Sequence, residues 1–141
     1  MADNVRWHPE QFQARLKRHM NRNLDMAAIS LASFIRGSFG NSGATGTRSG
    51  ATKAQRAANR SMAWGPPNVD TGHLKRNVGH DTPAGRPAVR RVGTGIGNKD
   101  SVGYAMWLEY GTRSTLPRPF LRPALQKMRT MIRRMITRPM R

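Results

Sequence analysis

The sequence has no cysteine and no long apolar run. Without cysteine, disulfide bonds and thiolate metal sites are excluded, and nothing indicates an oxidising compartment. No stretch approaches the roughly 18 apolar residues of a membrane span, and the first residues, MADNVRWHPEQF, lack the apolar core of a signal peptide. We therefore expect a soluble protein that folds in the cytoplasm and has no membrane partner.

Acidic and aromatic residues are scarce. The chain has 7 Asp and Glu against 25 Lys and Arg, which gives a formal net charge of +18. Such a surplus repels itself in a compact fold and attracts polyanions. Aromatic residues make up 6% of the chain, while its 14 glycines and 9 prolines favour loops over packed interior. The 141 residues therefore predict a single domain, 1–141, with a modest core and an anionic neighbour.

Two segments have the periodicity of amphipathic helices. From Pro9 to about Arg36 apolar residues recur at helical steps, with Pro9 suited to the first turn and Gly37 to a left-handed residue after the end. A second helix is predicted after Pro119. The apolar side of this second helix contains Leu121, Leu125, Met128, Ile132, Met135 and Ile136, and its basic side contains Arg122, Lys127, Arg129, Arg133, Arg134 and Arg138.

The region between these helices predicts a long loop and a small antiparallel sheet. Residues 37–66 begin with a glycine-rich stretch, and we interpret them as a mobile interaction arm or a plain linker. The spacing of Leu74 and Val78 allows either a short helix or the start of a strand. The β-branched stretches 88–97 and 101–106 predict a hairpin at about 88–106. The fold class expected is α+β, with residues 139–141 as a tail.

Candidate sites for chemistry are weak. The glycines of VGTGIGN, residues 92–98, do not have the spacing of a dinucleotide-binding loop, and no helix follows them. His73, His80, Asp70 and Asp81 lie close together in the sequence, but they match no metal-ligand motif, and surface histidines and turn aspartates explain them better. No activated nucleophile is apparent. We therefore expect no enzyme activity, no metal and no cofactor, and retain a metal-dependent nuclease only as a hypothesis to exclude.

The end of the chain is strongly basic. From Arg118 to Arg141 there are eight basic residues and no acid. A basic helix face is commonly no more than the solvated side of a packed helix, but this surplus favours contact with DNA or with an acidic protein surface. No motif for sequence-specific recognition is present. The expected contact residues are the basic side of the second helix: Arg122, Lys127, Arg129, Arg133, Arg134 and Arg138.

Three segments follow one another in a characteristic order: DTGHLKRNV at 70–78, YAMWLEYGT at 104–112 and PRPFLRPAL at 117–125. They resemble the tail-completion (neck) proteins of long-tailed double-stranded-DNA bacteriophages, whose pattern is D-T-G-x-L, then Y-A-x-x-x-E-[FY]-G-T, then P-F-[LM]-x-P-A. The matching residues are Asp70, Thr71, Gly72, Leu74, Tyr104, Ala105, Glu109, Tyr110, Gly111, Thr112, Pro119, Phe120, Leu121, Pro123 and Ala124. They span about two-fifths of the chain. The glycine-rich stretch at 37–50 is less typical of that family.

This resemblance implies a structural protein of the virion, assembled in the host cytoplasm. It would complete the tail and help to join tail to head as one of several copies in a ring. The implied partners are copies of itself, connector proteins, and tail-tube or tail-terminator proteins, with genomic double-stranded DNA in the lumen as a further contact. The alternative is a small basic protein that binds nucleic acid without sequence preference, which the +18 charge supports.

The resemblance segments also predict a stiff joint before the last helix. We expect Tyr104 and Ala105 to end a strand, and residues 106–108 to pack inward on a helical turn. Glu109 would then accept hydrogen bonds from the Gly-Thr turn or from an arginine such as Arg113 or Arg118. Prolines would hold Phe120 and Leu121 against the core or a neighbouring subunit.

Overall fold

The computed structural model describes residues 8–39, 67, 72–96 and 103–140. Along the chain, the elements are α1 (Pro9–Ser38), α3 (His73–Arg76), β1 (Val78–Asp81), β2 (Arg91–Thr94), α4 (Tyr104–Tyr110) and α5 (Leu121–Ile136). Long helices near both ends and a two-stranded antiparallel sheet between them confirm the α+β class. Most of the arm predicted at 37–66 lies outside the described residues, as do Asp70 and Thr71.

Helix α1 is the longest element, and it confirms the helix predicted from Pro9. The expected end at Gly37 is wrong, because the helix continues through Gly37 to Ser38. The chain leaves the helix at Phe39, which has extended backbone angles and is buried. The helix therefore ends without a left-handed residue at Gly37, and the residue after it contributes its ring to the core.

The hairpin pairs different segments from those predicted. Strand β2 lies within the predicted stretch 88–97, but it pairs with β1, in the register Val78 to Thr94 and Asp81 to Arg91. Residues 104–106, expected in the second strand, are helical. A Cβ atom on Gly79 would lie 2.8 Å from the carbonyl oxygen of Ile96. The chain after β2 thus folds closely over β1, and only glycine leaves room for it.

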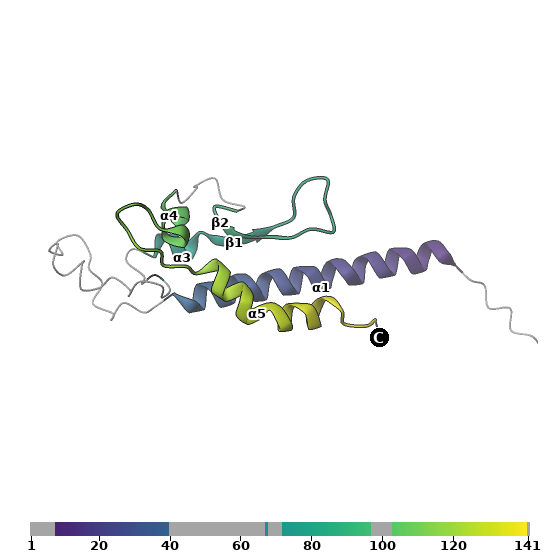
Figure 1. Ribbon diagram of the computed structural model, residues 1–141. Coiled ribbons are helices and arrows are strands. Elements are labelled where there is room, and N and C mark those ends of the chain that lie inside the picture. The colour runs from purple at the N-terminus through teal and green to yellow at the C-terminus, as the bar shows by residue number, and fades with distance from the viewer. Residues whose placement is uncertain (1–7, 40–66, 68–71, 97–102, 141) are drawn as a thin grey trace, which may run out of the picture.

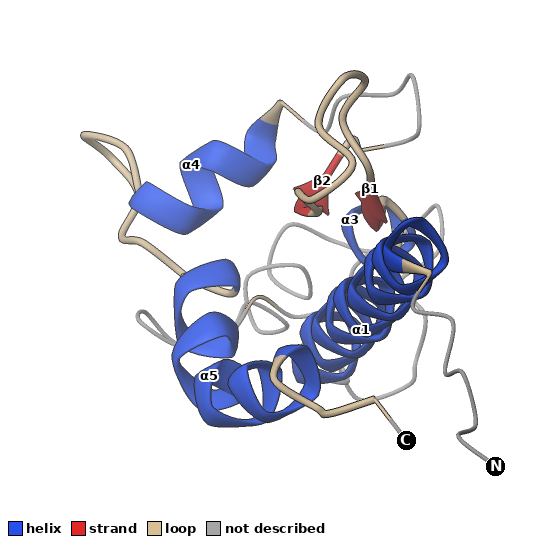
Figure 2. Ribbon diagram, turned by 90° about the vertical axis from the view of Figure 1, so that its right-hand side faces the viewer, coloured by secondary structure: helices blue, strands red, loops and turns tan. Residues whose placement is uncertain are grey.

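The core lies where α1 meets both the hairpin and α5. Figure 1 shows α5 along one side of α1 and the hairpin along the other, and Figure 2 shows the same arrangement from the end of α1. The most deeply buried large side chains are Phe120, Ile35 and Val78, which come from three different elements or their borders. Ala32 and Ala124 are buried in the same cluster and allow the backbones to approach closely. The core is small, as the composition predicts.

Two arginines connect the hairpin to α1. Arg36 donates to the carbonyl oxygen of Val78 from Nε at 2.9 Å and from Nη2 at 2.6 Å. Arg90, whose side chain is largely buried, forms an ion pair with Asp25 and donates from Nη1 to the carbonyl oxygen of Pro87 at 2.6 Å. The hairpin is therefore attached to α1 by charge-assisted bonds at two places.

Helix α5 confirms the helix predicted after Pro119, but its apolar face is rotated slightly from the prediction. Ala124 and Met128 are buried, and Leu121, Ile132 and Met135 are half-buried beside them. Leu125 and Ile136, which were assigned to the buried side, are 52% and 42% exposed. The small residue Ala124, which the prediction left out, marks the line of closest approach.

Candidate functional site

The two C-terminal resemblance segments form one unit, which we call the α4–α5 joint (residues 104–123). In its first part, the strand ending predicted at Tyr104 and Ala105 is wrong, because both residues belong to α4. Ala105 and Glu109, one helical turn apart, are buried. Met106 and Trp107, predicted to pack inward, are 63% and 58% exposed. Because α4 is a helix, the buried residues follow a spacing of four, and the residues beside them face outward.

Glu109 is buried and bound to backbone donors. Its Oε2 accepts the N–H groups of Phe120 at 2.8 Å and Leu121 at 3.0 Å, and its Oε1 accepts the N–H of Arg122 at 3.0 Å. The predicted donors, the Gly-Thr turn and the side chains of Arg113 or Arg118, are therefore wrong. The N-terminus of a helix offers unpaired N–H groups and a partial positive charge, which a carboxylate satisfies well.

Pro123 completes this arrangement. The first residues of α5 would leave their N–H groups without an intrahelical partner, and Glu109 accepts those of Phe120, Leu121 and Arg122. The next residue, Pro123, has no N–H group. One carboxylate and one proline therefore leave no unpaired donor at this helix start, although Glu109 lies 11 residues before Phe120 in the sequence.

The turn between the two helices depends on Gly111. Its φ of 78° is a left-handed value, and a Cβ atom there would lie 2.9 Å from the carbonyl oxygen of Thr115 and 3.0 Å from Pro117. Thr112 and Thr115 pair in a short bridge, which closes the turn. The N–H of Arg118 then donates to the carbonyl oxygen of Leu108 at 2.7 Å. The turn thus brings the chain back into hydrogen-bonding contact with α4 before α5 begins.

Phe120 fastens the joint to the core. Its side chain is 1% exposed, and its ring centroid lies 5.3 Å from that of Phe39, in a tilted arrangement. Phe39 follows α1 directly, so this contact connects the start of α5 to the end of α1. Pro119 and Leu121 beside Phe120 are half-buried. The prediction that Phe120 is held against the core is therefore confirmed.

The first resemblance segment is only partly described. Gly72 has a left-handed φ of 74° immediately before α3, and Leu74 is buried in the core. The spacing of Leu74 and Val78 allowed either a short helix or the start of a strand, and both occur: Leu74 lies in the short helix α3, and Val78 begins strand β1.

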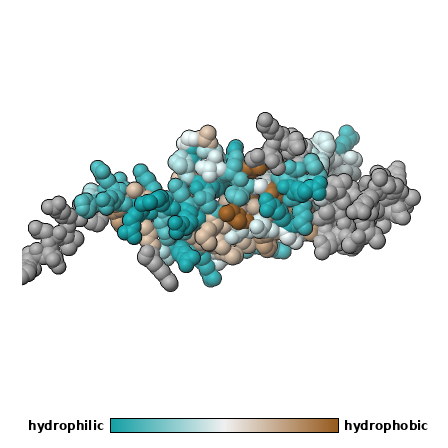
Figure 3. Space-filling model, turned by 180° about the vertical axis from the view of Figure 1, so that it is seen from behind, coloured by the Kyte–Doolittle hydropathy of each residue, from teal (hydrophilic) through white to brown (hydrophobic). Residues whose placement is uncertain are grey.

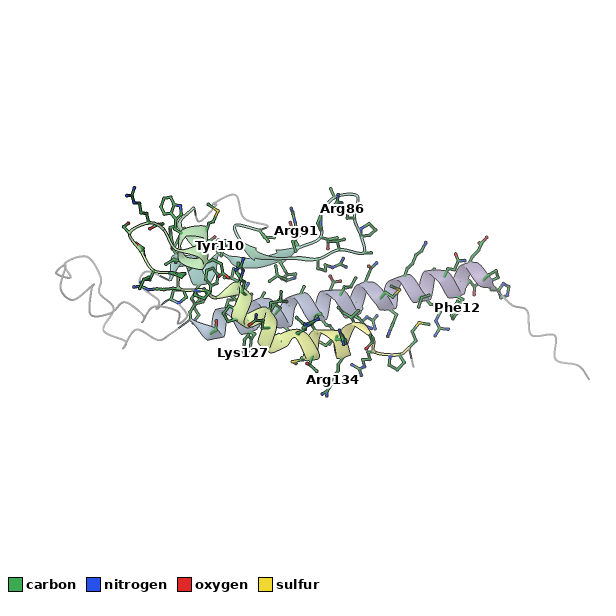
Figure 4. The ribbon with its side chains drawn as sticks, viewed as in Figure 1. Phe12, Arg86, Arg91, Tyr110, Lys127 and Arg134 are labelled. Atoms are coloured by element: carbon green, nitrogen blue, oxygen red, sulfur yellow. The ribbon has the colours of Figure 1, made fainter. Side chains whose placement is uncertain are left out.

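The predicted basic residues lie on the outer side of α5. Arg122, Lys127, Arg129, Arg133 and Arg134 are exposed, and Arg138 is exposed just beyond the helix. The guanidinium of Arg122 lies 4.7 Å above the ring centroid of Tyr110, a cation–π contact within the joint. Figure 4 shows Lys127 and Arg134 on the side of α5 that faces away from the hairpin. Arg86 and Arg91 belong to the hairpin, on the other side of α1.

Sequence reasoning missed the residues that hold the other end of α5. Asn23, buried in α1, donates from Nδ2 to the carbonyl oxygens of Ile136 at 3.5 Å and Arg138 at 3.2 Å. His19 contacts the same Arg138 oxygen at 2.8 Å. These side chains pair carbonyls that the end of a helix leaves free. His19, Asn23 and the buried Ala27 follow one another at a spacing of four, so they lie on the same face of the helix. Two polar residues in line with a buried one could have indicated a hydrogen-bonding role for His19 and Asn23.

The histidines and aspartates considered for a metal have other surroundings. His73 and His80 are exposed. Asp81 accepts two hydrogen bonds from Arg91, at 2.9 and 2.6 Å, and this contact lowers the pKa of Asp81 below its ordinary value. Within the described ranges, no three His, Asp or Glu side chains are grouped so that they could hold a metal ion. In the same ranges, no helix is long and apolar enough to cross a membrane.

No family model, curated protein or solved structure matches the chain significantly. What the protein does is therefore inferred from its residues and their geometry.

Proposed function

We propose that this chain is a structural subunit of the neck of a long-tailed double-stranded-DNA phage. It completes the tail and helps to join tail to head, as one of several copies in a ring within the virion. The observation that carries the proposal is the α4–α5 joint. The two C-terminal segments that resemble neck proteins meet there, through the bonds from Glu109 to Phe120, Leu121 and Arg122.

The joint supports a mechanical role because its conformation is closely constrained. Gly111 fixes the turn, Glu109 fixes the start of α5, and Phe120 fixes both to the core. A ring subunit has to present its contact surfaces at a repeatable angle, so a joint with few accessible conformations reduces the entropy lost on assembly. This role requires no reacting group and no cofactor.

Exposed apolar side chains support assembly with neighbours. Met106, Trp107 and Tyr110 of α4 are each at least 58% exposed, and Leu116 in the following turn is 62% exposed. On α1, Phe12, Leu16 and Met20 are exposed at helical spacing. The N-terminal part of this helix extends past the end of α5 (Figure 1). Figure 3 shows further apolar residues among hydrophilic ones on the rear face. Exposed apolar patches mark protein contacts, here with other copies, connector proteins, or tail-tube or tail-terminator proteins.

The second candidate is a small basic protein that binds nucleic acid without sequence preference. The exposed basic side of α5 favours it. This candidate does not account for the exposed apolar residues of α4, which a freely diffusing monomer would leave in water. It predicts a monomer that is absent from virions.

Interruption of the reading frame in the phage that encodes it tests the proposal. Electron microscopy of the lysate should show filled heads beside unattached tails, or tails with faulty ends. Supplying the intact chain from a plasmid should restore joined particles, which controls for effects on neighbouring genes. Normal infectious particles from the interrupted phage would contradict the proposal.

A further inference from the structure

The outer face of α5 has an unusual side-chain composition. Its polar residues are all arginine, lysine, glutamine or threonine, and each of them can donate hydrogen bonds. No acid occurs from the start of α5 to the end of the described chain. The exposed polar residues of this face are Arg122, Gln126, Lys127, Arg129, Thr130, Arg133 and Arg134.

The charge of this face is not neutralised inside the protein. Asp25 and Asp81 are paired with Arg90 and Arg91, and Glu109 is used at the buried start of α5. No ion pair involving α5 is found in the part of the chain that the structure describes. Arg129 and Arg133 are four residues apart, a spacing at which like charges destabilise a helix. A bound anion would relieve that repulsion.

The dimensions of the face fit a nucleic-acid backbone. Arg122 and Arg134 are 12 positions apart within α5, which corresponds to about 18 Å of helix at roughly 1.5 Å per residue. That length matches about five phosphates of one strand at roughly 3.4 Å each. Arg122, Arg129 and Arg133 lie along one edge of the face and Lys127 and Arg134 along the other, so two rows of donors are available.

The chemistry of the face favours nucleic acid over an acidic protein. The centre of a protein interface is normally apolar or aromatic, and charged residues are depleted there. On α5 the centre of the exposed face contains Gln126 and Thr130, between the two rows of basic residues, and the exposed apolar residues, Leu125, Met131 and Ile136, lie along its borders. We propose that this face binds the phosphate backbone of double-stranded DNA, without reading its sequence. The inference concerns α5 alone and does not depend on the neck role.

A pair of matched variants of the full chain tests the inference. The first is Arg129→Gln/Arg133→Gln/Arg134→Gln on the outer face of α5. The second is Arg15→Gln/Arg18→Gln/Arg22→Gln, which removes the same charge from exposed positions of α1. Glutamine and arginine have similar helix propensity, so both variants should fold, and thermal melting by circular dichroism verifies this. Binding is measured by fluorescence anisotropy with a labelled duplex over a range of salt concentrations.

We expect the α5 variant to lose at least about tenfold in affinity for the duplex, and the α1 variant less than about threefold. The slope of log affinity against log salt should also fall by up to about 2.7 in the α5 variant, as three phosphate contacts are lost. Duplexes of scrambled sequence should bind equally well. Two probes of similar length, single-stranded DNA and poly-glutamate, serve as comparisons.

Three results would overturn the inference. If the intact chain does not bind the duplex, α5 has no DNA-binding face. Equal losses in the two variants would show that only the overall charge acts. Equally tight binding of poly-glutamate, with the same loss in the α5 variant, would assign the face to acidic protein surfaces.

Discussion

The carboxylate of Glu109 accepts the backbone N–H of Phe120 at 2.8 Å across the turn between α4 and α5. The glutamate is 6% exposed and the phenylalanine 1% exposed, so this bond lies away from water. In such surroundings a charge-assisted hydrogen bond is stronger than at the surface, and an unpaired donor is costly. The pair therefore couples helix capping to core packing, because the residue whose N–H is bound is also the one whose ring is most deeply buried.

Replacing Glu109 by glutamine should destabilise the protein by about 2–3 kcal/mol. The amide keeps one acceptor oxygen, but its NH₂ group would face backbone N–H donors, and the interaction with the helix dipole would be lost. Urea denaturation measures the effect. Glu10→Gln is the matched control, since Glu10 is exposed in the first turn of α1, and it should change stability by less than about 0.5 kcal/mol. Equal stability of the two variants would contradict the structural role of Glu109.

Replacing Gly111 by alanine should cost at least about 3 kcal/mol. The left-handed φ of 78° and the contacts with Thr115 and Pro117 both oppose a side chain there. Gly37→Ala is the matched control: Gly37 lies in α1 with open space around it, and alanine should stabilise that helix by about 0.5 kcal/mol. Thermal unfolding of both variants measures the difference, and a fully stable Gly111→Ala protein would show that the turn can readjust.

The two long helices were predictable from the sequence because their signals are local. The apolar spacing from Pro9 onward and after Pro119 indicates a helix in each segment. It indicates only in part which side meets the core, since Phe12, Leu16 and Leu125 are exposed. The burial of Phe120 was predictable for a related reason, since prolines on both sides leave its backbone few conformations. Such features depend on residues that are neighbours along the chain.

The helical turn predicted at residues 106–108 is confirmed, but the hairpin partner and the start of α4 were predicted wrongly because their signals are not local. Strand β1, with the sequence VGHD, has little intrinsic preference for a strand and forms through its pairing with β2 and the close approach of Ile96 to Gly79. In α4, the buried spacing of Ala105 and Glu109 outweighs the strand preference of its aromatic residues. Glu109 was correctly expected to accept hydrogen bonds, but its donors lie at the start of a helix whose first residue, Leu121, is 12 positions later. Tertiary contacts of this kind cannot be seen in a single stretch of sequence.

Replacing Asn23 by alanine should cost about 1–2 kcal/mol, because the carbonyl oxygens of Ile136 and Arg138 would lose a buried donor. Hydrogen exchange should show faster opening in the last turn of α5, although the mutation lies in α1. Asn21→Ala provides the control, since it removes the same side chain two residues away and should be neutral or slightly stabilising in a helix. Equal exchange rates in the two variants would contradict the proposed link.

The ion pair of Asp25 and Arg90 should make stability depend on pH. The hydrogen bond from Arg90 lowers the pKa of Asp25 below its ordinary value of 3.8. The ionised pair therefore stabilises the fold above the unfolded-state value, and this contribution is lost as pH falls through the lower folded-state value. Asp25→Asn should cost about 1 kcal/mol at neutral pH, because the aspartate is half exposed, and clearly less at about pH 2, below the ordinary pKa of 3.8. Urea midpoints at the two pH values measure this, and an equal deficit at both would contradict it.

Replacing Trp107 by serine should separate assembly from folding. The side chain is 58% exposed, so its loss should change the free energy of unfolding by less than about 0.5 kcal/mol. If α4 contacts a neighbour in a ring, however, a central tryptophan can supply more than 2 kcal/mol to that contact. The variant should therefore fold normally but fail to restore joined particles to a phage that lacks the intact chain, while Trp107→Phe should restore most of them. Full restoration by the serine variant would place the assembly contact elsewhere on the subunit.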